Sequence, residues 1–166
     1  DEADTFFHGL RTRVEALEQT HRQSPLTADL AMSSAKRFLA RPEHRIQLGE
    51  LVGEHTARML AAIEAADMPT QGSFTKEEYV RRLARYEAAS EVLAKVVGVL
   101  GRWGEGPELT HVIEAIEVQY AAAQESHGGL VIWLNIRAYP AVLLFTAYAL
   151  GLVRASRWET LNDLFQ

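Results

Sequence analysis

Two glutamate–histidine pairs have the spacing with which helical bundles bind two metal ions. They are Glu18 with His21 and Glu108 with His111, each a Glu-x-x-His motif. In carboxylate-bridged bundles, two such motifs and two further glutamates point inward from four helices. At about 100° per residue, His21 falls within an apolar stripe, whereas His111 falls opposite one and should face solvent. Because only one motif points inward, we expect no metal site.

Four residues are candidates for ligand binding. His55 lies in the middle of an apolar helix stripe, while Asn135 and Arg137 interrupt the most apolar segment, with Tyr139 beside them. An arginine is costly to bury unless it is paired, so Arg137 is a candidate anchor for an anion or another ligand near Pro140. The alternatives for Arg137 are an internal ion pair with a glutamate and an exposed helix edge. The alternative for His55 is a hydrogen-bonded core residue.

Three aromatic residues, Trp133, Tyr148 and Trp158, are candidates for a protein interface, since Trp and Tyr contribute much of the energy where partners meet. Alternatively, they are packing anchors within the domain. No catalytic residue is assigned, because the chain has no Gly-rich phosphate loop, Gly-x-Ser-x-Gly elbow or His-Glu-x-x-His motif. We expect no cofactor and favour a non-catalytic protein over an enzyme.

The composition bounds the class of protein. The 166 residues predict a single domain, 1–166, which buries about 70% of its unfolded surface. Up to position 83 there are 11 basic and 13 acidic residues, and after it 6 and 9, which together give a net charge of −5. Neither half is basic, which argues against nucleic-acid binding. The absence of cysteine excludes disulfides and thiol catalysis.

Targeting signals are also absent from the sequence. Residues 1–20 lack the basic start and apolar run of a signal peptide, so we expect a cytoplasmic protein. The segment 130–153 comes nearest to a membrane span, but the apolar run after Arg137 has 16 residues, against about 20 for a span. We expect no membrane helix here. The chain does not begin with Met and ends within a helical pattern, which suggests a region of a longer polypeptide.

Apolar residues recur at helical spacing throughout, which predicts an all-α fold. Short connections favour an antiparallel bundle or a short helical stack of about seven helices. The expected helices span residues 4–22, 27–40, 42–66, 75–103, 108–126, 130–153 and 156 to the C-terminus.

Local signals define several helix ends. Pro42 suits the first turn of one helix, and Pro140 should kink or split the apolar one. Thr75-Lys76-Glu77-Glu78 and Ser156-Arg157-Trp158-Glu159 both resemble capping boxes.

Two helices are expected to be buried on more than one side. The helix over 42–66 has an apolar stripe and, beside it, the small residues Gly49, Gly53 and Ala57. Small residues four apart let a neighbouring helix approach closely, so this helix should lie between two layers. The segment 130–153 is apolar all round, which places it at the centre of the core or of an interface.

Two resemblances point towards interaction proteins. In residues 147–165, Tyr148, Gly151 and Leu152 precede a turn and then Arg157-Trp158-Glu159-Thr160-Leu161, which resembles a tetratricopeptide-type helical hairpin. A longer series runs from Arg137 through Tyr139-Pro140, Leu143-Leu144, Ala147-Tyr148-Ala149 and Gly151-Leu152 to Arg157-Trp158 and Leu161. It is similar to helical regions of bacterial multidomain proteins with SIR2-like, TIR or STAND modules, many linked to phage defence. That resemblance implies a sensor, scaffold or oligomerisation role.

These observations favour a non-catalytic helical interaction module of a larger bacterial protein. Its partner would be another protein or another domain of the same polypeptide, and a homo-oligomer is possible. The alternative is a helical bundle that binds a small ligand or a metal ion, with possible enzymatic activity. Its candidate residues are His21, His55, Glu18 and Arg137.

Overall fold

A computed structural model describes residues 27–125 and 128–165. The described part is all-α and contains no strand, which confirms the predicted fold class. The expected helix over 4–22, with Glu18 and His21, lies outside the described residues.

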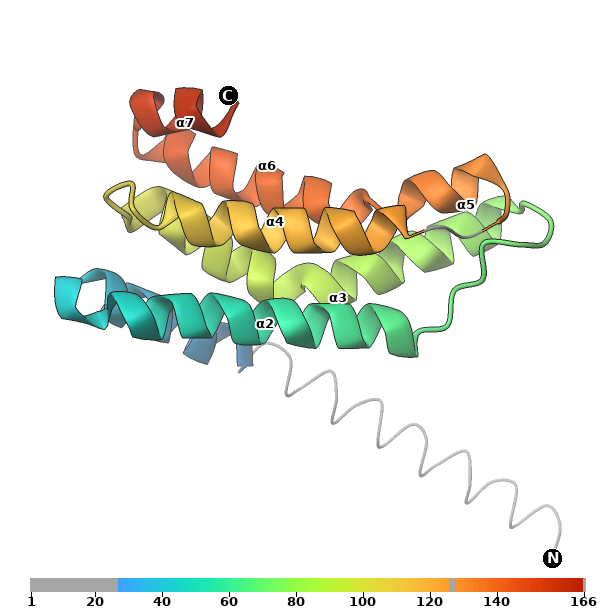
Figure 1. The fold of residues 1–166 in the computed structure, drawn as a ribbon, viewed down its shortest axis with the longest axis horizontal. Helices are drawn as coiled ribbons and strands as arrows, with labels where there is room; N and C mark the ends of the chain where they lie inside the picture. Colours follow the sequence, from blue (N-terminus) through green and yellow to red (C-terminus); the bar gives the residue numbers. More distant parts are fainter. Residues whose placement is uncertain (1–26, 126–127, 166) are drawn as a thin grey trace, which may run out of the picture.

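The described chain begins with a helical segment over residues 27–39. The 3-10 turn η1 (Pro42–His44) follows and leads into α2 (Arg45–Ala65). The remaining helices are α3 (Lys76–Trp103), α4 (Leu109–Gln124), α5 (Val131–Ile136), α6 (Tyr139–Arg154) and α7 (Trp158–Leu164). Figure 1 shows α2, α3, α4 and α6 running in alternating directions, as short connections between neighbours require.

Proline and threonine define helix starts as expected. Pro42 lies in the first turn of η1, and Pro140 lies in the first turn of α6. The apolar segment is therefore split rather than kinked, with α5 ending at Ile136. Thr75 accepts a hydrogen bond from the backbone N–H of Glu78 at 3.1 Å. The box is only half formed, because the Glu78 carboxylate instead binds Arg81 and Arg82.

The second predicted capping box is wrong. Ser156 has a φ of +56° and lies just past the end of α6 rather than at the start of α7. Its N–H donates to the Val153 carbonyl, and the N–H of Arg157 donates to the Leu152 carbonyl, both at 3.0 Å. This pattern is a Schellman motif, which satisfies the last carbonyls of a helix. Ser156 therefore ends one helix instead of capping the next.

The core lies within a ring of four helices, in which α2 contacts α3, α3 contacts α6, α6 contacts α4, and α4 contacts α2. The most extensive contact is between α3 and α6, where glycines let the backbones meet. A Cβ added to Gly101 would lie 2.4 Å from the Tyr148 carbonyl oxygen, and one added to Gly151 would lie 2.6 Å from that of Gly98. Both positions therefore require glycine for this packing.

The small-residue side of α2 differs from expectation. Gly49 meets the ring of His111, which an added Cβ would approach to 2.9 Å, but Gly53 has open space beside it. This side of α2 borders a shallow groove against α4 instead of a closely packed helix. His111, expected to face solvent, is 31% exposed because it packs over Gly49 in the α2–α4 contact.

Helix α6 is buried on one side only. Leu144, Tyr148 and Leu152 are fully buried, whereas Val142, Leu150 and Val153 are 43–55% exposed. An all-round apolar helix thus lies at the edge of the described fold, with an apolar side facing out.

Candidate functional site

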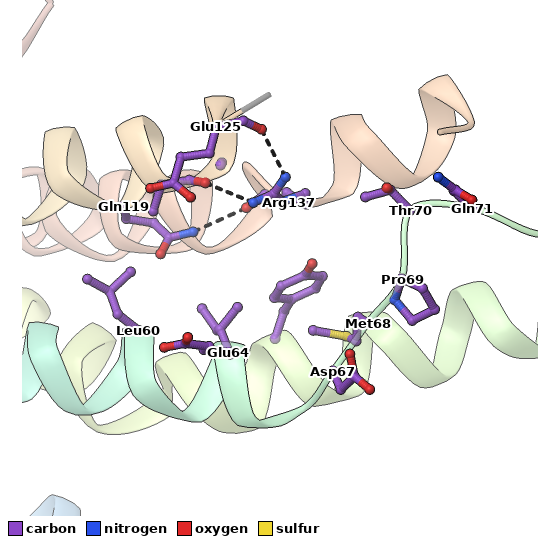
Figure 2. A pocket seen from close by; sticks show the side chains of 14 residues that line it. Leu60, Glu64, Asp67, Met68, Pro69, Thr70, Gln71, Gln119, Glu125 and Arg137 are labelled. Atoms are coloured by element: carbon purple, nitrogen blue, oxygen red, sulfur yellow. Dashed lines mark hydrogen bonds between the residues drawn. The ribbon is translucent and has the colours of Figure 1, made fainter. Parts of the chain in front are cut away.

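A cavity of about 630 Å³ lies where five segments of the chain meet. Its walls come from the end of α2, the loop after it, Tyr86 of α3, the end of α4 and the turn between α5 and α6 (Figure 2). Apolar side chains such as Leu60 and Met68 share the lining with the polar residues Gln119 and Arg137. We refer to this cavity as the α2–α4 end pocket.

Arg137 lines the α2–α4 end pocket, but its guanidinium is directed at the backbone of α4. It donates to the carbonyl of Ala122 at 2.9 Å and to that of Glu125 at 3.3 Å (Figure 2). The last carbonyls of a helix have no partner within the helix, and the helix dipole favours a cation there. Arg137 therefore ties the α5–α6 turn to the end of α4, which none of the sequence alternatives described.

The loop that lines the pocket is held by contacts between Thr70 and the chain just before α5. Thr70 donates its hydroxyl hydrogen to the Gly128 carbonyl at 2.6 Å, and its own carbonyl accepts from the N–H of Leu130 at 2.9 Å. Gly129 passes so close that an added Cβ would lie 2.2 Å from the Thr70 carbonyl oxygen. With a φ of +156°, it also has a backbone conformation that favours glycine.

Arg82 is a structural residue that sequence reasoning missed. Its side chain is only 6% exposed, and it donates to Glu78 Oε1 and to the Pro69 carbonyl, both at 2.7 Å. The guanidinium also lies 4.0 Å from the ring centre of Trp133. Its position was readable, because residue 82 lies between Tyr79 and Tyr86 on the buried face of α3.

The structure does not bring the four predicted ligand-binding residues together. Asn135 and Tyr139 line a different concavity from Arg137, and His55 is buried on α2 without lining either of the two. The Tyr139 hydroxyl donates to Glu87 at 2.9 Å, and this bond is the main reason its pKa is raised.

Two of the three interface candidates lie inside the domain. Trp133 is 1% exposed and Tyr148 is fully buried, which corrects the interface prediction for both. Trp133 packs against Phe74 and Tyr79. Burial and the charge of nearby Glu108 raise the pKa of Tyr148. Trp158 is 59% exposed at the start of α7 and remains accessible to a partner.

The second concavity is an apolar groove of about 750 Å³, here named the α5–α6 groove. It lies between the first half of α3 and the α5–α6 segment. Val131, Ile132 and Val142 are 69%, 37% and 55% exposed there, and Leu150 and Val153 extend the exposed apolar side along α6. Its lining comprises Tyr79, Leu83, Val131, Ile132, Asn135, Ile136, Ala138, Tyr139 and Val142.

The Glu108 and His111 pair diverges in the structure. The Glu108 carboxylate is buried and accepts from the Gly106 N–H at 2.9 Å and from Arg157 at 3.2 Å. His111 lies on the α2 side of α4, with Nδ1 3.7 Å from Glu114. Within residues 27–125 and 128–165, no group of three or more His, Asp or Glu residues is placed to hold a metal ion.

One described stretch, Val131–Arg154, is long and apolar enough to cross a membrane by length and composition alone, and 39% of its most apolar window is buried. The core helix of a water-soluble protein meets the same criterion. In the structure, the stretch is divided at Arg137 into α5 and α6.

Comparison of the chain with protein-family models, with curated proteins and with solved structures found no match. Function is therefore argued from the geometry of the described residues.

The buried position of His55 predicts a pH dependence of stability. Burial lowers its pKa below the usual 6.5, the charge of Arg58 lowers it further, and Glu54 partly opposes this. Between the lowered pKa and 6.5, the unfolded chain binds a proton that the folded chain does not. The contribution of His55 is thus complete above this window and is lost as the pH falls through it.

Urea unfolding from about pH 7.5 down to about pH 5 measures this effect. The free energy of unfolding should fall more steeply in the wild type than in His55→Gln. His111→Gln, which removes a partly buried histidine of α4, is the comparison variant, and a loss of slope confined to His55→Gln assigns the effect to His55. Equal slopes for wild type and His55→Gln would show that His55 does not contribute.

Proposed function

We propose that the chain is a helical protein-interaction module and that the α5–α6 groove, with the outer side of α6, is its contact surface. In line with the resemblance over residues 137–164, it would act as a scaffold or sensor region of a larger cytoplasmic bacterial protein. Many of the multidomain proteins that this stretch resembles are linked to defence. The proposal does not require a catalytic centre.

The observation that carries the proposal is the exposed apolar side of α6. Between Arg137 and Arg154 the chain has no charged residue, and Thr146 is the one polar side chain among the exposed residues of α6 in that stretch. Val142, Leu150 and Val153 lie eight and three residues apart, spacings that place them on the same outer face of α6. Burial of apolar side chains yields roughly 25 cal/mol per Å², and contiguous exposed patches of this kind are typical of interaction sites.

A second copy of the chain is the partner that this surface fits best. A two-fold interface places the same patch on both subunits, so a charged patch would face its own charges. The outer side of α6 carries none and can pair with itself without like-charge repulsion. The remaining surface charge, −5 overall, then stays in solvent.

Sedimentation of the chain over a range of concentrations tests the proposal. We expect a dimer with a dissociation constant of about 1–100 µM, as for transient interfaces. Val142→Glu combined with Leu150→Glu should give a monomer with unchanged helicity, because carboxylates would be buried at the interface. The matched control, Leu30→Glu with Ile46→Glu, changes residues that are 62% and 74% exposed outside this surface and should still dimerise.

A wild-type chain that stays monomeric throughout would overturn the choice of partner. If the Val142→Glu and Leu150→Glu double variant dimerises as strongly as the Leu30→Glu and Ile46→Glu control, a surface other than the α5–α6 groove and the outer side of α6 mediates dimerisation. Co-sedimentation of the wild type with lipid vesicles, lost in the Val142→Glu and Leu150→Glu variant, would indicate a membrane surface instead of a protein.

A further inference from the structure

We propose that the α2–α4 end pocket binds a small organic cation, a primary ammonium or guanidinium compound with an apolar body. This site is separate from the α5–α6 groove and does not depend on the interaction proposed for that groove.

The first observation is an unpartnered acceptor in the pocket wall. Gln119 is 2% exposed, and its Nε2 donates to the Arg137 carbonyl at 3.1 Å, whereas its Oε1 has no hydrogen-bond partner. Rotating the amide by 180° would place Gln119 Oε1 against the Arg137 carbonyl oxygen, and two acceptors form no hydrogen bond. The Nε2 group therefore faces this carbonyl, and Oε1 faces the other way. Figure 2 shows Oε1 on the side of the amide that faces the cavity.

A buried acceptor without a partner is costly, and a donor that enters the pocket would remove this cost. Arg137 does not donate to Gln119 Oε1, because its guanidinium is directed at the carbonyls of Ala122 and Glu125. The ligand should therefore carry N–H groups.

The second observation is the charge of the lining. The carboxylate of Glu64, at the end of α2, lies across the cavity from Gln119, and Asp67, in the loop after α2, lies farther along the same wall near Met68 (Figure 2). Arg137 is the one cation among the lining residues, against three acids that include Glu125, while Arg82 and Arg85 bind the loop from outside the lining at the carbonyls of Pro69 and Ala66. Carboxylates close to a partly enclosed space attract a cation and repel an anion.

The third observation is the apolar part of the wall. Leu60, Ile63 and Met68 line the pocket together with Tyr86, which is 2% exposed as a residue. A tyrosine is uncharged at neutral pH, and burial raises the pKa of Tyr86 further from that range. A neutral aromatic ring accepts a cation at its face, and the aliphatic side chains can cover a hydrocarbon body. The volume of about 630 Å³ lies within the range of small-molecule sites.

Titration of the whole chain with phenethylammonium and with agmatine tests the proposal. Calorimetry measures affinity, and the side-chain amide resonance of Gln119 in NMR spectra reports contact with the proposed site. Both cations should bind saturably and shift that resonance. Phenylethanol, the neutral analogue, and phenylacetate, the anionic one, should bind at least about tenfold more weakly, because neither offers a charged donor.

The matched variants change charge without changing the core. Glu64→Gln with Asp67→Asn should weaken cation binding about tenfold, since two carboxylates are neutralised. Asparagine tolerates the φ of +42° at position 67. The control, Glu50→Gln with Glu117→Gln, neutralises two exposed carboxylates outside the pocket lining and should bind as the wild type does.

Two results would overturn the proposal. One is the absence of saturable binding by either cation, with the Gln119 resonance unmoved, which would leave water as the donor to Oε1. The other is equal binding by phenylethanol and phenethylammonium, or equal affinity in both double variants, which would mean that the carboxylates do not select the ligand. Neither result bears on self-association through Val142 and Leu150, so the two proposals fail independently.

Discussion

Replacing Trp133 with alanine should lower the free energy of unfolding by about 3–5 kcal/mol, the usual cost of removing a large aromatic side chain from a core. Trp133 is 1% exposed, and Phe74 and Tyr79 pack around its ring. The ring also supports the guanidinium of Arg82, 4.0 Å away, which would face a cavity in the variant. Chemical denaturation followed by circular dichroism measures the loss.

Two controls separate this role from that of an interface residue. Trp158→Ala should change stability by no more than about 0.5 kcal/mol, because the side chain is 59% exposed. Trp133→Phe should cost less than the alanine change, since it keeps a ring and removes the indole N–H, which has no partner in the structure. A Trp133→Ala protein as stable as the wild type would contradict the packing described here.

Replacing Glu108 with alanine should lower the free energy of unfolding by about 3–5 kcal/mol, because it removes one partner of a buried ion pair and leaves Arg157 without its carboxylate. The carboxylate accepts from the N–H of Glu105 at 3.1 Å, from that of Gly106 at 2.9 Å and from Arg157 at 3.2 Å. It thereby joins the turn between α3 and α4 to the start of α7. The turn is built around the carboxylate, since a Cβ on Gly104 would lie 1.9 Å from Glu108 Oε1.

Glu108→Gln is the matched comparison, because it keeps the size and one acceptor oxygen but removes the charge. We expect Glu108→Gln to be less stable than the wild type and more stable than Glu108→Ala. Combining Glu108→Ala with Arg157→Met should cost less than the sum of the two single changes, since neither charge is then left without its partner. Strict additivity in this double-mutant cycle would show that the two side chains do not interact.

The helices were predictable because their signals are local. A helix depends on residues three and four apart and on the residue that caps it, so the hydrophobic spacing located the ends of α3 and α4 to within two residues and those of α2 to within three. Thr75 and Pro140 acted as helix-start residues for the same reason, since each affects only the adjacent turn. The second capping box failed, because Ser156 is close enough to α6 to end it.

The candidate site was not predictable in this way, because it is assembled by contacts between distant segments. Gln119 and Arg137 line one cavity with Glu64 and Asp67 only because the ends of α2 and α4 lie side by side. Sequence reasoning singled out Arg137 as a ligand anchor, an internal ion-pair partner or an exposed residue, but not as a partner of the α4 carbonyls, because those acceptors are not visible as a motif.

By itself, the sequence determined the all-α class, the positions of most helices and the apolar character of the segment containing α6. Only the tertiary structure decided which side of α6 meets α3 and which is left exposed, and whether an aromatic residue such as Trp133 or Trp158 lies in the core. The physical reason is that helix formation depends on short-range spacing, whereas burial depends on which distant surface each helix packs against. For a helix that is apolar all round, hydrophobic spacing alone cannot distinguish these sides.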